Sequence, residues 1–271
     1  MKTMKQMTGL LAMLLLAVSI QSCSNSQKKK EAAEAQAVIK QEVQQFAYPL
    51  PSMFELTEML TEINAGYIVT LSNDPAKAKT YFSDQEKAIN LGSYASDLAY
   101  AITYNSQAEV EAYFQACELL ARDLGLVEAF DKNLPDQIKS NINNREELIK
   151  IVTDMFEKAY SHLNGQGRTD ISYLILSGSV VEGLYLATNI SENAYQNPEI
   201  VKAIISQKES LVKLQALMEK SKDSDSLKDV YAHIAKINAI YAQTEGSKAM
   251  TKRQIEELTS LVNVLRAIYT K

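Results

Sequence analysis

The sequence predicts an all-α protein, an antiparallel array or bundle of about eight to ten helices with a weak internal two-fold repeat. The 271 residues include only nine glycines and five prolines, the residues that most often interrupt helices. No long segment alternates apolar and polar residues as a half-buried strand does. Apolar residues instead recur every three or four positions, as on one face of a helix. The clearest such stripe is Ile255, Leu258, Val262, Leu265 and Ile268.

Residues 1–22 are predicted to be an export signal. Lys2 and Lys5 give a positive start, and the apolar stretch 9–18 has the length of a signal-peptide core rather than of a membrane-spanning helix. Ser22 and Cys23 follow and resemble the lipobox of bacterial lipoproteins, in which the cysteine is diacylated and becomes the first residue. Ordinary cleavage after Ser19, which would release an unlipidated protein, is the alternative.

A lipid-anchored cell-envelope protein is therefore the expected product. Two long acyl chains, such as palmitoyl groups, anchor a protein to a membrane far more stably than one. Ser24, rather than an acidic residue, follows Cys23, which in lipoproteins is compatible with sorting to the outer membrane. We expect the chain to face the periplasm and to meet the membrane through this anchor.

Residues 23–47 are predicted to form a lipid-anchored tether, because they are rich in Ala, Glu, Gln and Lys and carry only a weak apolar stripe. The sequence Tyr48-Pro49-Leu50-Pro51 is expected to end the tether as a stiff extended piece. A single helical domain should then occupy residues 48–271.

Start and stop signals divide this domain into helices. Serine or threonine followed three residues later by an acid or amide forms a capping box at a helix start. Four such pairs occur: Ser52–Glu55, Ser83–Glu86, Ser106–Glu109 and Thr251–Gln254. Pro75 and Pro198 suit a first helical turn, whereas Gly125, Gly165 and Gly246 suit helix ends. Helices are expected near residues 30–46, 52–72, 75–81, 84–104, 107–124, 127–132, 145–163, 169–191, 198–220, 225–244 and 252–270.

Composition argues against several classes of function. The formal net charge is −5 with no clustered basic face, so nucleic acid is not an expected partner. Cys117 lies on an apolar helical stripe and is predicted to be a core residue. No metal-binding, phosphate-binding, dinucleotide-binding or nucleophile motif occurs in the sequence. We therefore expect no metal or cofactor, and we favour a protein that is not an enzyme.

Two helices share a short pattern. The segments 92–101 and 178–187 both begin Gly-Ser, with Leu at the seventh position and Ala at the tenth. Gly92 and Gly178 each lie inside a helical pattern, where glycine costs about 1 kcal/mol relative to alanine. Close approach of two backbones is the expected compensation, so the two helices should pack against each other.

Asp97 and Glu182 are the acidic residues within these apolar helices. A buried carboxylate needs a donor or a cation, so one hypothesis is a shared polar pocket of Asp97, Tyr100, Glu182 and Tyr185 that binds a cation or small polar ligand. The alternative is that each acid is neutralised as a structural pair by Arg145, Arg168, a lysine or a tyrosine hydroxyl, or points outward.

Three blocks carry a resemblance to a known group of proteins. They are Tyr48-Pro49-Leu50-Pro51, residues 91–101 and residues 181–187, and they resemble an uncharacterised family of helical lipoproteins from anaerobic Gram-negative gut bacteria. The resemblance implies a cell-envelope location and supplies no activity.

Two classes of function follow. The preferred one is a non-enzymatic envelope scaffold that binds a partner protein or a small ligand. The other is a hydrolase or ligand-processing enzyme with Asp97 and Glu182 as its acid and base, which requires both carboxylates in one solvent-accessible cleft.

Overall fold

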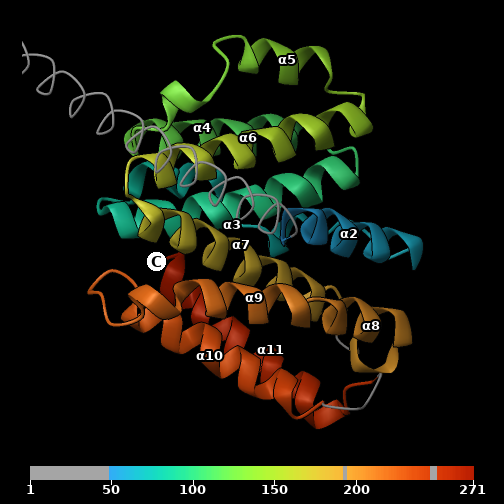
Figure 1. Ribbon diagram of the computed structural model, residues 1–271. Coiled ribbons are helices and arrows are strands. Elements are labelled where there is room, and N and C mark those ends of the chain that lie inside the picture. The colour runs from blue at the N-terminus through green and yellow to red at the C-terminus, as the bar shows by residue number, and fades with distance from the viewer. Residues whose placement is uncertain (1–48, 192–193, 245–248) are drawn as a thin grey trace, which may run out of the picture. The chain divides into compact units, whose positions relative to one another are not determined.

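The computed structural model describes residues 49–191, 194–244 and 249–271, all of which belong to one compact unit. These residues form ten α-helices and no strand (Figure 1), which confirms the all-α prediction. The α-helices are α2 (Pro49–Glu62), α3 (Asp84–Thr103), α4 (Gln107–Asp123), α5 (Leu134–Ser140), α6 (Arg145–Gly165), α7 (Thr169–Asn189), α8 (Pro198–Ser206), α9 (Lys208–Met218), α10 (Lys228–Ala242) and α11 (Lys252–Tyr269). The helix expected at 30–46, the signal, the tether and Cys23 lie outside the described residues.

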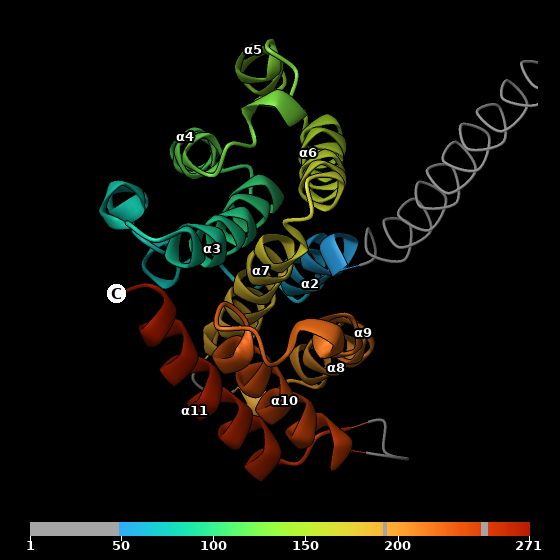
Figure 2. The ribbon, with the colours of Figure 1, turned by 60° about the vertical axis from the view of Figure 1, so that its left-hand side comes forward.

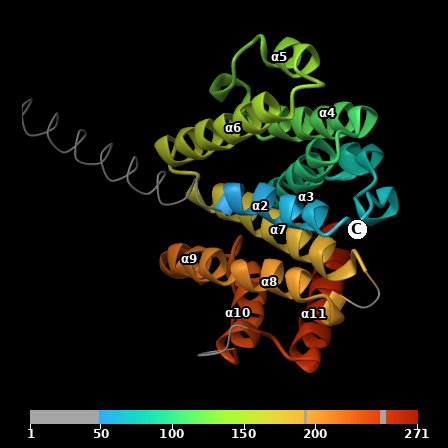
Figure 3. The same ribbon diagram turned by 90° about the vertical axis from the view of Figure 1, so that its right-hand side faces the viewer.

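Helix α7 lies in the middle of this unit. Helices α4, α5 and α6 lie on one side of it and α8 to α11 on the other (Figures 1 and 3). Among the described helices, α7 is long and apolar enough to cross a membrane, but 89% of the apolar segment is buried inside the unit. The serines, glycines and Glu182 within residues 171–188 indicate a core helix rather than a membrane span, and the burial of this segment agrees with that interpretation.

Helix α3 packs against α7 more extensively than any other described pair of elements, as the two glycines predicted. A Cβ atom on Gly92 would lie 1.7 Å from the carbonyl oxygen of Ile175, and one on Gly178 would lie 1.9 Å from that of Ile89. Each glycine therefore packs against the backbone carbonyl group of the residue that lies three positions before the other glycine. This reciprocity is a local two-fold relation; duplication of a larger part of the chain stays a prediction.

The segment expected as one helix over 52–72 ends ten residues early. Helix α2 starts at Pro49 rather than near Ser52, because the first turn needs no backbone N–H and accepts proline. The described part of the expected extended piece, residues 49–51, is therefore helical, and Ser52 lies inside the helix rather than at the start that the predicted capping box requires. At the other end Asn64 has a positive φ of 57°, and the chain continues into a short 3₁₀ turn, Val69–Leu71.

Three other boundaries also differ. The helix expected at 198–220 is divided at Gln207 into α8 and α9, where the buried Tyr241 hydroxyl donates to the carbonyl oxygen of Ile204 at 2.7 Å. The expected helices at 75–81 and 127–132 are 3₁₀ segments, Pro75–Thr80 and Val127–Ala129. Helix α5 was not predicted.

The other predicted helix starts and ends are confirmed in part. Ser83–Glu86 and Thr251–Gln254 form complete capping boxes, as predicted. Ser106 precedes α4, but its side chain makes no cap hydrogen bond, so that box is wrong. Pro75 and Pro198 occupy first turns, and Gly125 follows α4 with a φ of 74°.

Candidate functional site

One face of α3 holds the backbone of the segment 65–74, which connects α2 to the rest of the unit. The hydroxyl groups of Tyr104 and Tyr94 donate to the carbonyl oxygens of Ala65 and Asp74, at 2.7 and 2.8 Å. Tyr100, one of the predicted pocket residues, accepts a hydrogen bond from the N–H of Ile68 at 3.0 Å. These tyrosines face the same segment and pair three of its backbone polar groups, outside the 3₁₀ turn Val69–Leu71.

Asp97 and Glu182 come together beneath this segment, and both side chains are fully buried. Asn73 bridges them: its N–H donates to Asp97 Oδ2 at 3.0 Å and its side-chain amide donates to Glu182 Oε2 at 3.4 Å. Asp97 and Glu182 also lie close enough to hydrogen-bond to each other. The structure therefore brings these two predicted residues into one cluster.

Arg266 of α11 supplies the positive charge of the cluster. Its Nε lies 3.0 Å from both carboxylate oxygens of Glu182, and one terminal nitrogen donates to the carbonyl oxygen of Leu71 at 2.8 Å. The guanidinium carbon lies 3.9 Å from the ring centroid of Tyr185. Burial lowers the pKa of Arg266, but Glu182 raises it above its ordinary value overall. The cation held beside Glu182 and Tyr185 is thus the chain's own guanidinium group.

The two carboxyl groups do not carry equal charge. Burial raises the pKa of Asp97 well above its ordinary value, and the negative charge of Glu182 raises it further. Burial also raises the pKa of Glu182, whereas Arg266 opposes that rise. Because Arg266 contacts Glu182 and not Asp97, the rise in pKa favours protonation of Asp97 over protonation of Glu182. The backbone N–H of Asn73 and the side chain of Ser72 oppose the rise in the pKa of Asp97 but do not cancel it.

This arrangement suits a structural cluster better than a catalytic one. General acid–base catalysis requires a substrate within hydrogen-bond reach of the carboxyl groups, and Asp97 and Glu182 line none of the described cavities. The arginines considered from the sequence bind elsewhere, Arg145 to Glu58 and Arg168 to Asp84. Arg266 was missed, although it follows Val262 by four positions and therefore borders the buried stripe of the last helix.

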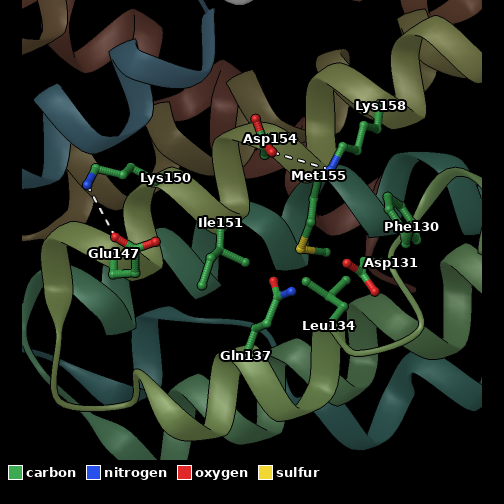
Figure 4. Close-up of a pocket in the computed structure, with 10 residues that line it drawn as sticks. All are labelled: Phe130, Asp131, Leu134, Gln137, Glu147, Lys150, Ile151, Asp154, Met155 and Lys158. Carbon is green, nitrogen blue, oxygen red and sulfur yellow. Dashed lines mark hydrogen bonds and ion pairs between the residues drawn. The ribbon is translucent and has the colours of Figure 1, made fainter.

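An open cleft of about 480 Å³ lies between α5 and α6. Ile151 and Met155 of α6 and Leu134 and Gln137 of α5 point toward one another across it (Figure 4). Its rim carries charges that are already paired: Lys150 with Glu147 at 3.2 Å, and Lys158 with Asp154 at 3.3 Å. Apolar side chains beside charged and polar ones fit an amphipathic ligand.

Two further cavities adjoin this cleft. One, of about 160 Å³, lies between α4 and α5, and the other, of about 30 Å³, lies in the core between α3, α4, α6 and α7. Phe130 and Met155 line all three cavities. The sequence did not indicate this region, because the cleft depends on α5 and on where residues 127–133 place Phe130.

The described residues offer no metal centre. No group of three or more His, Cys, Asp or Glu residues within 49–191, 194–244 and 249–271 is placed to hold a metal ion. Cys117 is buried and unpaired, as its place on an apolar stripe predicted.

The chain shows no significant match to any protein-family model, curated protein sequence or solved structure.

Proposed function

We propose that this chain is a lipid-anchored cell-envelope protein whose helical unit binds an amphipathic small molecule in the cleft between α5 and α6, without chemistry on it. The observation that carries the binding role is that Phe130 and Met155 line three adjoining cavities. The largest of these, about 480 Å³, lies within the range of roughly 300–1,000 Å³ that small-molecule sites occupy.

The envelope assignment rests on the sequence of the first 23 residues and on the resemblance to helical lipoproteins. Anchoring through Cys23 would place the helical unit beside a membrane surface, where amphipathic molecules are abundant. A hydrolase acting through Asp97 and Glu182 is less well supported, because both carboxyl groups are buried and are bound by Asn73 and Arg266.

A titration with the neutral fluorescent probe N-phenyl-1-naphthylamine tests the binding role. The probe should bind the wild-type protein with enhanced fluorescence, and Ile151→Trp should weaken binding at least about tenfold, or about 1.4 kcal/mol, because the indole fills the cleft. Val264→Trp is the matched control, since Val264 lines a separate groove between α10 and α11.

The two variants separate the possible outcomes. Loss of binding in Ile151→Trp alone supports the cleft, whereas loss in Val264→Trp alone would move the site to the groove between α10 and α11. Absence of binding to the wild-type protein would contradict the proposed function.

A further inference from the structure

A narrow crevice lies behind the cleft, at the centre of the unit. Its eleven lining residues are all apolar and come from α3, α4, α6 and α7, with Phe130 and Met155 on the side of the cleft. Its volume is about 30 Å³, close to the share of one water molecule in the liquid. Cys117 is one of the lining residues and is fully buried.

We infer that Phe130 is a gate between the cleft and this crevice, and that the crevice receives the terminal carbon atoms of the hydrocarbon chain of a single-chain amphiphile, whose remaining length lies in the adjoining cavities. This inference rests on the binding role proposed for the cleft and adds the ligand class and the gating residue. When the side chain of Phe130 moves away, the space that its ring occupied connects the crevice to both outer cavities.

The lining determines what enters. A polar group placed there would lose its hydrogen bonds to water and find no partner, which costs several kcal/mol, on the order of 2–7. Ala95, Ala121 and Ala159 contribute short side chains to the walls, so the space suits a slender chain rather than a bulky ring. Met155 adapts its flexible side chain to such an occupant.

The rim determines which head group stays outside. The charged residues of the outer cleft are three acids, Asp131, Glu147 and Asp154, and two bases, Lys150 and Lys158. Both lysines are already paired with acids, and the rim is slightly negative. A zwitterionic head group is therefore favoured over an anionic one.

The segment that carries Phe130 makes few buried contacts with the rest of the unit. The 3₁₀ turn Val127–Ala129 has no buried residue, and α5 buries only Leu134 and Ile138. Its side-chain hydrogen bonds are local, as between the N–H of Asn133 and Asp131 Oδ1 at 2.9 Å. Figure 2 shows α5 at the outer edge of the unit, beyond α4 and α6. Segments with few buried contacts open at low free-energy cost.

The reaction rate of the Cys117 thiol measures how often the gate opens. Burial raises the pKa of its thiol well above the ordinary value, so it reacts only when reagent and water reach the crevice. The experiment uses the full-length chain with Cys23→Ser, which leaves Cys117 as the only cysteine, and follows its reaction with 4,4′-dithiodipyridine. Phe130→Ala should speed labelling at least about tenfold, because the gate loses its packing. Val212→Ala, at an exposed position on α9 that lines none of these cavities, should leave the rate unchanged.

Ligand protection tests the chain site. Dodecanoyl lysophosphatidylcholine, kept below its micellar concentration and at about ten times its Kd, should slow labelling of the protein with Phe130 intact about tenfold, because only unoccupied protein reacts. Dodecanoate should protect more weakly. N-phenyl-1-naphthylamine binding is measured on the same samples.

The outcomes are distinct. Faster labelling in Phe130→Ala together with protection by lysophosphatidylcholine supports the inference. Labelling unaffected by Phe130→Ala, or unprotected while the fluorescent probe still binds at the cleft, overturns the inference and leaves the proposed function standing. Failure of both the probe and the amphiphile to bind overturns both.

Discussion

Asp97 is a buried carboxylic acid whose pKa is raised well above its ordinary value, and this has a measurable consequence for stability. The native protein holds a proton on Asp97 that the unfolded chain releases above the ordinary carboxyl pKa of about 4. The free energy of unfolding therefore falls as pH rises from about 4 toward the raised pKa of Asp97. Asp97→Asn removes this contribution, and the side-chain oxygen of the asparagine still accepts the hydrogen bond from the N–H of Asn73. We expect Asp97→Asn to match or exceed the wild-type stability at pH 8, with a flatter pH dependence between pH 5 and 8, in urea unfolding.

Glu182→Gln is the contrasting variant, because it leaves the half-buried Arg266 without a counter-ion. Breaking such a pair costs about 2–5 kcal/mol, and we expect that loss at pH 8 in the same urea experiment. An Asp97→Asn protein that lost as much as Glu182→Gln would show that Asp97 is ionised.

At the scale of the helix, the contact between α3 and α7 requires glycine at two positions. A methyl group at Gly92 would overlap the carbonyl oxygen of Ile175, so Gly92→Ala forces the two backbones apart. We expect a loss of about 3 kcal/mol or more in the free energy of unfolding, the upper part of the range for overpacked cores. Thermal and urea unfolding measure it.

Gly165→Ala provides the same chemical change without the contact. Gly165 is the last residue of α6, and a Cβ there would meet nothing within 4 Å. Its substitution should change stability by no more than about 1 kcal/mol, in the favourable direction, because alanine is the better helix former. Equal effects at Gly92 and Gly165 would refute close approach as the reason for glycine at position 92.

At the scale of the whole molecule, the envelope proposal predicts that Cys23 carries the lipid. Labelled palmitate should enter the wild-type protein and be lost in Cys23→Ala, and globomycin should cause the unprocessed precursor to accumulate. Palmitate that persisted in Cys23→Ala would contradict acylation at this residue. Cys117→Ala is the control, since that buried thiol is not an acylation site and its variant should label normally.

Features with short-range causes were predictable from the sequence. The capping boxes at Ser83 and Thr251 depend on residues three positions apart, and the all-α class follows from the periodicity of apolar residues. The pairing of α3 with α7 was also predictable, because glycine destabilises the interior of a helix and close packing of a second backbone compensates for that cost.

The break at Gln207 and helix α5 carry no such local signal. The first coincides with a hydrogen bond from Tyr241, 37 positions from Ile204. The second is a short helix that buries only two of its residues, too few to produce a clear stripe.

The sequence by itself determined the helical class, the central glycine contact and the presence of two acids that had to be neutralised in the core. Only the tertiary structure decided that Arg266, 84 positions from Glu182, is the neutralising group, and that the hollow lies beneath α5 rather than beside the acids. The physical reason is the same in both cases: a counter-ion and a cavity are defined by side chains that meet across distant parts of the chain, and no local pattern records which ones will meet.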